Sequence, residues 1–255
     1  MFTSEFELNT AVYGEVKKRK PQLAILPWGA TEPHGYHLPY GTDNLITSAI
    51  ACMVAEGASR RNVNAMVLPC IPFGPQNRGQ VELPFCLNSS LETMRHIFAD
   101  VVESLERQGI NKLIVMIGHG GDTYGIKALI RDFSISHPDF DIVSNEYWNI
   151  VLDKSGIFGA EIDDHAGEEE TSLMLYLYPE FVKMELAGDG ASKDFSMPSL
   201  RDGVGWMPRD WAKTSVDSGI GDPRNASAEK GRRYLNELLP PIIQLAVEFA
   251  TRRPY

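Results

Sequence analysis

The stretch from residue 26 to residue 44 constrains the fold of this chain more than any other. It interleaves proline and glycine with four side chains that can bind a metal ion, namely Glu32, His34, His37 and Asp43. Proline fixes its own φ and glycine reaches backbone conformations that other residues avoid, so the stretch cannot form a regular helix or a central strand. It is predicted to be a shaped loop of the kind that carries chemistry on a rigid scaffold. A turn-rich surface loop with merely solvated polar side chains is the alternative.

Apolar runs of strand length alternate with helical patterns through the first part of the chain. The predicted strands cover residues 22–28, 64–71, 112–118 and 139–148, and the predicted helices cover residues 7–19, 42–57, 89–108 and 122–136. This alternation predicts βαβ crossovers and a largely parallel sheet with helices on both faces. We therefore expect a three-layer α/β/α fold that forms a single domain over residues 1–255.

The second part of the chain is less regular. A buried helix is expected after His165, and a final helix is expected from Ser227 to Arg252, interrupted or kinked at Pro240 and Pro241. Residues 186–226 are rich in Gly, Asp, Ser and Pro. So long an irregular stretch in a compact domain is usually a functional lid or an oligomer contact.

Both loops that are rich in possible ligands directly follow predicted strands. The second loop reads Gly-His-Gly-Gly-Asp from residue 118 to residue 122. Because ligands gather at the carboxyl edge of a parallel sheet, Glu32, His34, Asp43 and His119 should lie at one edge. Carboxylate oxygens and imidazole nitrogens are ligands for divalent metals. Asp43 can instead be read as a helix cap.

Composition excludes several classes of function. The formal net charge of −10 argues against nucleic-acid binding, and no apolar run approaches the length of a membrane span. The N-terminus has no signal-peptide pattern, and the three cysteines read as buried thiols in a reducing compartment. Cys86 paired with a distant histidine is a poor nucleophile candidate, because its apolar setting should raise its pKa. We expect a soluble cytoplasmic protein without nucleic-acid or membrane partners.

Four separated motifs resemble the creatininase (creatinine amidohydrolase) family. They are Glu-Pro-His-Gly-Tyr-His-Leu-Pro at 32–39 with Asp43, the Gly118-His119 step, His-Ala-Gly-Glu at 165–168 with Glu170-Thr-Ser, and Gly221-Asp-Pro followed by Ala228-Glu-Lys-Gly. The resemblance implies a pair of divalent ions per chain, with zinc expected and manganese or iron as alternatives. It assigns Glu32, His34, Asp43 and His119 as ligands, with Asp43 bridging. It also implies a homo-oligomer, expected to be a hexamer.

The chain departs from the family in its second motif. Creatininase proper has an aromatic residue and a metal-binding glutamate directly after the Gly-His step, where this chain has Gly120 and Gly121. A replacement carboxylate must come from elsewhere, and Glu168 is our candidate. The alternative is that Glu168, Glu169 and Glu170 only complement a helix N-terminus.

The resemblance implies hydrolysis of a C–N amide bond in a small molecule. A water held between two metals loses a proton near neutral pH, and His165 is expected to act as the acid and base, with a hydrogen-bonded core histidine as the alternative. Because Gly120 and Gly121 leave one wall open, we expect a cyclic amide or an N-formyl or N-acyl amide, and not creatinine, to be the best substrate. Trp148, Trp206 or Trp211 could refill that wall. A metal-stabilised binding or regulatory protein that keeps this fold without turnover is the alternative function.

Overall fold

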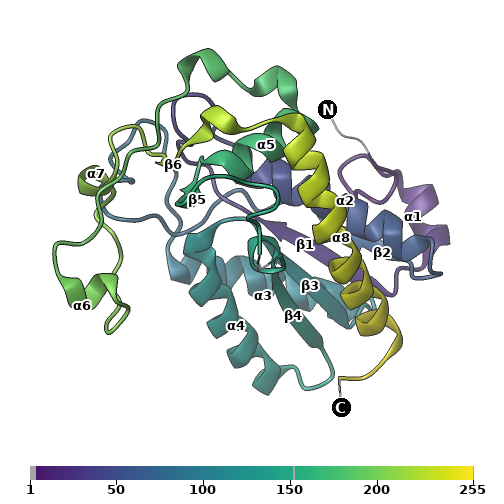
Figure 1. The fold of residues 1–255 in the computed structure, drawn as a ribbon. Coiled ribbons are helices and arrows are strands. Elements are labelled where there is room, and N and C mark those ends of the chain that lie inside the picture. Colours follow the sequence, from purple (N-terminus) through teal and green to yellow (C-terminus); the bar gives the residue numbers. More distant parts are fainter. Residues whose placement is uncertain (1–3, 152, 255) are drawn as a thin grey trace.

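Four parallel strands form the central sheet of the computed structural model, which describes residues 4–151 and 153–254 (Figure 1). In spatial order the strands are β2 (Ala65–Val67), β1 (Leu23–Trp28), β3 (Lys112–Ile117) and β4 (Asp141–Glu146). β1 and β3 are therefore neighbours, and residue 28 pairs with residue 117 at their carboxyl ends. The predicted parallel sheet is confirmed.

Successive side chains of β1 and β3 pack alternately into two separate hydrophobic cores, one on each face of the sheet. Leu23 and Ile25 belong to one core, and Ala24 and Leu26 belong to the other. This follows from the alternation of side chains along a strand. Because both faces are buried, both strands read as continuous apolar runs in the sequence.

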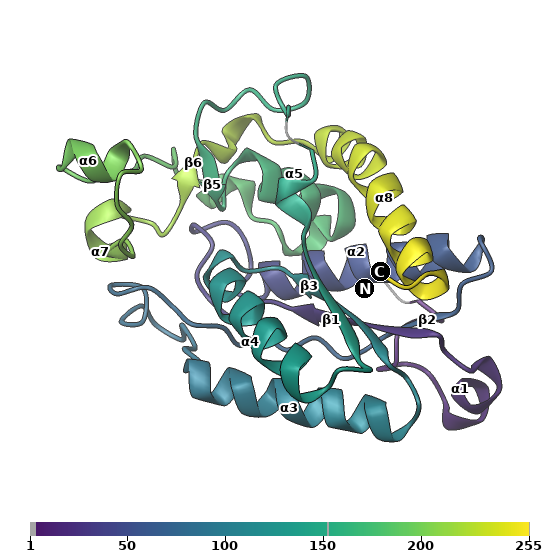
Figure 2. The ribbon, with the colours of Figure 1, turned by 90° about the horizontal axis from the view of Figure 1, so that it is seen from below.

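Helices cover both faces, so the predicted three-layer architecture is confirmed (Figure 2). The first core contains residues of α2 (Thr42–Ser59), α5 (Glu168–Leu177) and α8 (Ala228–Thr251). The second contains residues of α3 (Leu91–Arg107) and α4 (Thr123–Ser136). The short helix α1 (Tyr13–Arg19) has no buried residue.

Three local expectations differ from the structure. The helix expected over residues 7–19 begins only at Tyr13, because Glu7 forms a parallel bridge with Val67 beside β2. The helix expected over residues 89–108 begins at Leu91, after the N-cap Ser90, whose side chain accepts from the Thr93 N–H. The helix α8 continues through Pro240 and Pro241 without interruption.

Residues 186–226 contain only short elements, as expected. They are α6 (Pro198–Arg201), α7 (Trp211–Thr214), the 3-10 helix η5 (Pro223–Asn225) and the strand β6 (Ile220–Gly221), which pairs antiparallel with β5 (Asp163–His165). α6 and α7 project from the side of the three layers (Figures 1 and 2). We call residues 192–215, which carry α6 and α7, the excursion. Its two ends are joined by a bridge between Ser192 and Ser215 and by a hydrogen bond of 2.8 Å from the N–H of residue 193 to the carbonyl of residue 214.

Within residues 4–151 and 153–254, no helix is long and apolar enough to cross a membrane. The three cysteines are free; Cys52 is buried, and Cys70 and Cys86 are partly buried. Burial raises the pKa of the Cys86 thiol to about 12. This thiol is therefore protonated near neutral pH and is a poor nucleophile.

Candidate metal centre

The elements that carry the predicted ligands end at one edge of the sheet. Glu32 and His34 follow β1, His119 follows β3, and Asp43 lies in the first turn of α2. The two strand ends are held together, because the Gly118 N–H donates to the Trp28 carbonyl at 2.7 Å. The structure therefore brings together these four residues, which are distant in sequence, and buries all of them.

Three groups of possible ligand atoms meet at this edge. One consists of Glu32, His34 and His165, and the other two, called the two sets below, share Asp43. Glu32, Asp43 and His119 form the first set, with Nδ1 of His119 at 2.9 Å from Oε1 of Glu32 and 3.4 Å from Oδ2 of Asp43. His34, Asp43 and Glu170 form the second set. Within each set, one ligand atom of each residue lies within 4.8 Å of the others. Asp43 belongs to both sets.

The two carboxylate oxygens of Asp43 point to different histidines. Oδ1 lies 2.8 Å from Nε2 of His34, and Oδ2 lies 3.4 Å from Nδ1 of His119. A carboxylate placed in this way has one oxygen for each set of ligands. This is the geometry that a bridging role requires.

Backbone carbonyls fix the tautomers of the two histidines. A carbonyl can only accept, so Nδ1 of His34 donates to the Glu32 carbonyl at 3.1 Å, and Nε2 of His119 donates to the Pro75 carbonyl at 3.1 Å. In each neutral imidazole, the remaining nitrogen then carries a lone pair directed at the carboxylates. Metal-binding histidines are commonly oriented in this way by a second hydrogen bond.

The two carboxylate oxygens of Glu32 have different surroundings: one accepts a hydrogen bond, and the other faces the two sets of ligands, which together form the candidate metal centre. Its Oε2 accepts a hydrogen bond from Nε2 of Gln80, which is also buried. Its Oε1 and the Oδ2 of Asp43 are buried and face no hydrogen-bond donor among the described residues unless Nδ1 of His119 is protonated. Buried carboxylate oxygens without a donor are costly unless a proton or a cation satisfies them. The residues present therefore fit a divalent metal ion.

The pKa values show how strongly the centre attracts positive charge. Burial by itself would lower the pKa of His34, but Asp43, Glu170 and Glu32 outweigh it and raise that pKa to about 10. Burial likewise opposes the shift of His119, whose pKa is raised well above its ordinary value by Glu32 and Asp43. The pKa of Asp43 is lowered far below its ordinary value, because the two histidines outweigh the effect of burial. Metal binding must displace the protons that these groups hold.

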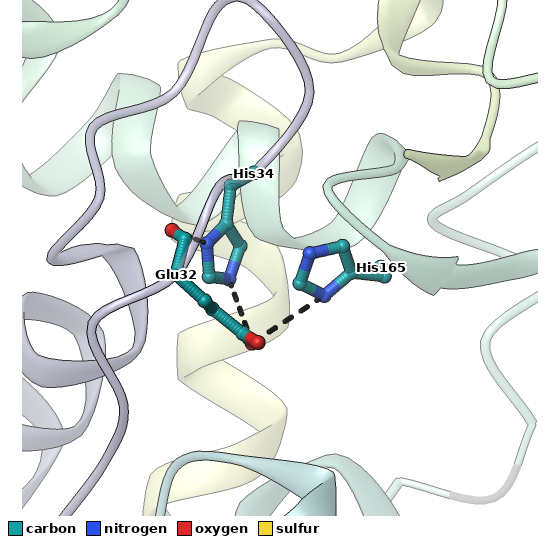
Figure 3. A group of neighbouring side chains, drawn as sticks. All are labelled: Glu32, His34 and His165. Atoms are coloured by element: carbon teal, nitrogen blue, oxygen red, sulfur yellow. Dashed lines mark hydrogen bonds and ion pairs between the residues drawn. The ribbon is translucent and has the colours of Figure 1, made fainter. Parts of the chain in front are cut away.

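His165 stands beside the two sets. Its ring centre lies 4.2 Å from that of His34, and its Nδ1 lies 3.9 Å from Oε1 of Glu32 (Figure 3). Its Nε2 donates to the Pro33 carbonyl at 2.9 Å. The nitrogen available for chemistry is therefore Nδ1, which faces Glu32 and the centre.

The structure does not bring Glu168 to the centre. Its carboxylate is buried, accepts from the backbone N–H groups of Gly159 and Ala160 at 2.8 and 2.9 Å, and pairs with Lys230. The carboxylate that does reach the centre belongs to Glu170, whose Oε2 lies 4.0 Å from Nε2 of His34 and accepts from the Ala166 N–H at 2.6 Å. The structure places Glu170, and not the expected Glu168, in the second set of possible ligands.

The remaining histidines lie outside the two sets. His37 is buried and forms a hydrogen bond of 2.9 Å with Oγ1 of Thr171. His96 is exposed on α3, and His137 caps the C-terminus of α4 and contacts Glu106. Of the four possible ligands in the loop at residues 26–44, His37 is therefore the one that joins neither set.

A cavity of about 150 Å³ opens beside the centre. Besides residues of the centre, its lining includes Gly120, Tyr147, Trp148, Lys154 and Asp164. A Cβ added at Gly120 would meet nothing within 4 Å, so the wall is open at this position. Of the three tryptophans that could refill it, only Trp148 lines the cavity.

Gly121 has a different role from its neighbour. A Cβ at this position would overlap both Nε2 of His119 and the Pro75 carbonyl oxygen. Only glycine therefore allows the hydrogen bond that fixes the tautomer of His119. Glycine at position 121, where creatininase proper has a glutamate, thus removes one carboxylate from the motif and at the same time allows the hydrogen bond that orients His119.

Sequence reasoning missed two residues of the centre. Glu170 had a signal, because it lies in the family motif that begins at His165 and continues through Glu170-Thr-Ser. Gln80 had none, since it lies in a loop without periodicity and reaches Glu32 only in the folded chain.

An α/β fold whose strand ends converge on buried imidazoles and carboxylates defines a metal-binding protein of the metallohydrolase class. The sequence model of the creatininase family, described as creatinine amidohydrolase, matches residues 7–246. The chain belongs to this family.

Two curated relatives illustrate the range of the family. The creatinine amidohydrolase of Pseudomonas putida is 29% identical over 230 residues, covering 84% of each chain. The mycofactocin precursor peptide peptidase of Mycobacterium ulcerans is 28% identical over 239 residues, covering 91% of this chain and 87% of the relative.

Solved structures agree with the fold over nearly all of its length. A Bacteroides fragilis protein assigned as a creatinine amidohydrolase superposes with a TM-score of 0.96 at 45% identity, covering 100% of both chains. A creatininase variant in a Zn–Zn form superposes with a TM-score of 0.80 at 26% identity, covering 97% of this chain and 98% of that one.

Proposed function

We propose that this protein is a two-metal hydrolase that cleaves a C–N amide bond in a small molecule. The observation that carries the proposal is the placement of Asp43, whose two oxygens face two different sets of ligands. Glu32 and His119 would hold one divalent ion, and His34 and Glu170 would hold the other, with Asp43 shared. Zinc is the expected metal, with manganese or iron as alternatives, and the donor set of imidazole nitrogen and carboxylate oxygen suits all three.

When bound, divalent ions supply Lewis-acid polarisation of the amide carbonyl and lower the pKa of a water molecule. The chain itself supplies the shape and the proton transfers. Gln80 and the Pro75 carbonyl hold Glu32 and His119 in fixed orientations, and burial keeps bulk water from the carboxylates. Fixed donors and acceptors in a buried site need no reorganisation during reaction.

His165 would be the acid and base of the reaction. Its Nε2–H is engaged by the Pro33 carbonyl, so Nδ1 is the atom that can take a proton from the nucleophile and give it to the departing nitrogen. Nδ1 faces the side of the centre where Glu32 Oε1 lies, and His165 lines the cavity that would hold the substrate. An acid–base group must lie within reach of the proton it transfers, and the position of Nδ1 beside the centre supports this role.

The proposed substrate class is a cyclic amide or an N-formyl or N-acyl amide, with creatinine a poor substrate. The open wall at Gly120 supports this proposal, and Trp148 is among the residues that line the cavity. The peptidase relatives supply a second candidate, a short peptide amide. The open wall favours either of these classes over creatinine.

The test is a comparison of kcat/KM for creatinine, a panel of cyclic and N-formyl amides, and short peptides, using one zinc-loaded preparation. Turnover of a panel amide well above that of creatinine supports the proposal. Creatinine turnover of about 10⁴ M⁻¹s⁻¹ or more would overturn the substrate class. If the metal-loaded protein cleaves no amide, the non-catalytic binding function would replace the enzyme.

We also propose that the protein acts in the cytoplasm as a homo-oligomer, a hexamer by family resemblance. Exposed apolar side chains on the excursion, such as Val204 and Trp206, support a role for that segment in subunit contact. Light scattering at micromolar concentration tests the assembly, and a monomer would contradict it.

A further inference from the structure

We propose that Trp211 and Ser218 are positioning residues that hold His165 in the orientation its Nδ1 needs for proton transfer. Both lie where the excursion returns to the body of the protein, and neither contributes to the two sets of metal ligands. The inference rests on the proposed role of His165. It deepens that role by identifying what fixes the imidazole.

The indole of Trp211 packs directly against the imidazole of His165. The ring centres are 5.4 Å apart, the planes meet at 88°, and Trp211 is buried. The imidazole also lies 4.2 Å from the ring of His34. Contact with two rings restricts rotation of the imidazole about its Cβ–Cγ bond, so the indole helps to keep Nδ1 directed at the centre.

Ser218 acts on the same imidazole through a shared acceptor. Its hydroxyl donates to the Pro33 carbonyl at 2.6 Å, and the Nε2–H of His165 donates to that same carbonyl at 2.9 Å. The hydroxyl oxygen also lies 3.5 Å from Nε2. A carbonyl oxygen has two lone pairs, and two donors occupy both of them here. The acceptor that selects the tautomer of His165 is therefore itself fixed.

The backbone at Ser218 is in the left-handed region, with φ of 73°. A residue other than glycine rarely adopts this conformation, and surrounding contacts must hold it there. Trp211 supplies one such contact, because its Nε1–H donates to the Ser218 carbonyl at 3.1 Å. The neighbouring Gly219 N–H donates to Asp217 at 2.9 Å. Trp211 thus supports the histidine twice, by ring contact and by holding the turn that presents Ser218.

The excursion is held to the rest of the protein near Trp211, and its two ends are also joined by the bridge between Ser192 and Ser215. The Trp211 N–H donates to the Arg78 carbonyl at 2.7 Å, and Arg209 pairs with Asp164 beside the cavity. Trp206, on the same excursion, is exposed and contacts Tyr124. Trp206 therefore offers a matched control, a tryptophan on the same segment that does not touch the site.

The experiment compares Ser218→Gly and Trp211→Phe with Trp206→Phe, each as the full-length zinc-loaded chain. Glycine tolerates the left-handed backbone, so Ser218→Gly removes the hydroxyl without adding strain. Trp211→Phe keeps an aromatic ring but removes the N–H. Magic-angle-spinning NMR of chains labelled with ¹⁵N at histidine reads the tautomer of His165, assigned with His165→Asn, and metal analysis reports whether the centre is intact.

We expect a single Nε2–H tautomer for His165 in the wild type and in Trp206→Phe. In Ser218→Gly and Trp211→Phe, we expect a second tautomer or orientation to appear while the metal content stays the same. With any amide that the wild type cleaves, kcat should fall by up to about 10²-fold with little change in KM, the size typical of a misplaced catalytic group. A wild-type NMR pattern in both variants would overturn the proposal. Absence of amide turnover in the wild type would instead count against the proposed function. Turnover is measured in the kinetic assay, whereas the orientation of His165 is measured by NMR, so the two failures are distinguishable.

Discussion

Oε2 of Glu170 lies 4.0 Å from Nε2 of His34, across the gap between the first turn of α5 and the loop that follows β1. The second set of ligands thus depends on how closely α5 packs onto the rest of the domain. A Cβ at Gly231 of α8 would collide with the backbone of Ser172 in α5, so the two helices are in direct backbone contact. The contact between α5 and α8 therefore helps to set the position of a metal ligand.

The first prediction separates Glu170 from Glu168. Glu170→Gln should lose about one divalent ion per chain, because an amide is a weak ligand and the second set then keeps only His34 and Asp43. Glu168→Gln should keep the full metal content. It should lower the free energy of unfolding by about 1–3 kcal/mol, since it leaves Lys230 without its buried partner. Elemental analysis and denaturant unfolding of both variants provide the measurements, and equal metal loss in both would remove Glu170 from its proposed role.

The second prediction concerns His165. His165→Asn should lower kcat by about 10²–10⁴-fold, the usual contribution of a general acid or base, while metal content stays unchanged. His96→Asn, on the exposed face of α3, should leave kcat unaltered. The same loss of rate accompanied by loss of metal would show that His165 is a ligand and not a proton carrier.

The third prediction contrasts two adjacent glycines. Gly121→Ala should disturb His119, because the added methyl group occupies the space of the hydrogen bond to the Pro75 carbonyl. We expect about a 10–100-fold loss of metal affinity, typical when the partner that orients a ligand is lost. Gly120→Ala enters open space and should bind metal like the wild type. Competition with a metallochromic chelator measures both affinities, and similar values for the two variants would refute the proposed role of Gly121.

The fourth prediction is a dependence of stability on pH. Burial lowers the pKa of His37 from 6.5 to about 4, with Asp217 opposing the shift and His34 adding to it. The unfolded chain takes up a proton on His37 below about pH 6.5, whereas the folded protein does so only near pH 4. The stability that neutral His37 contributes is therefore complete above pH 6.5 and is lost as the pH falls from 6.5 through 4.

The measurement is denaturant unfolding of the wild type and of His37→Gln between pH 4 and pH 7.5. Removing the titrating ring should flatten the pH slope of the free energy of unfolding by up to about 1.4 kcal/mol per pH unit, the limit for one proton. His96→Gln should keep the slope of the wild type. If His37→Gln keeps it as well, another group causes the acid sensitivity.

The sheet and its helices were predictable because each central strand is an apolar run of strand length and the long helices α3, α4 and α8 are amphipathic. The edge on which the ligands gather followed from the same pattern, since Glu32 and His119 both come directly after strands. Propensity failed at residues 7–12, where a bridge between Glu7 and Val67 replaces the first turns of the expected helix. It failed again at Pro240 and Pro241, which lie inside an uninterrupted α8.

The choice between Glu168 and Glu170 could not be made from local sequence alone. Both begin the same helix, and two residues along a helix point in roughly opposite directions. Which of them faces the centre depends on how α5 is rotated against α8, and Lys230 of α8 holds Glu168 on the far side. Contacts made by Gln80, Trp211 and Ser218 arise in the same way, from segments that meet only when the chain has folded.

The closed base of the excursion has a consequence for changing this protein by design. Ser192 and Ser215 form a bridge across it, so the two ends of the segment are held next to each other. Exchanging the residues between residue 193 and Arg209 would replace Val204 and Trp206, the exposed apolar side chains of the proposed subunit contact, while Trp211, Ser218 and the ligands lie outside the exchanged stretch. Because lengthening a loop adds only slowly to the entropic cost of closing it, inserted residues should cost little stability.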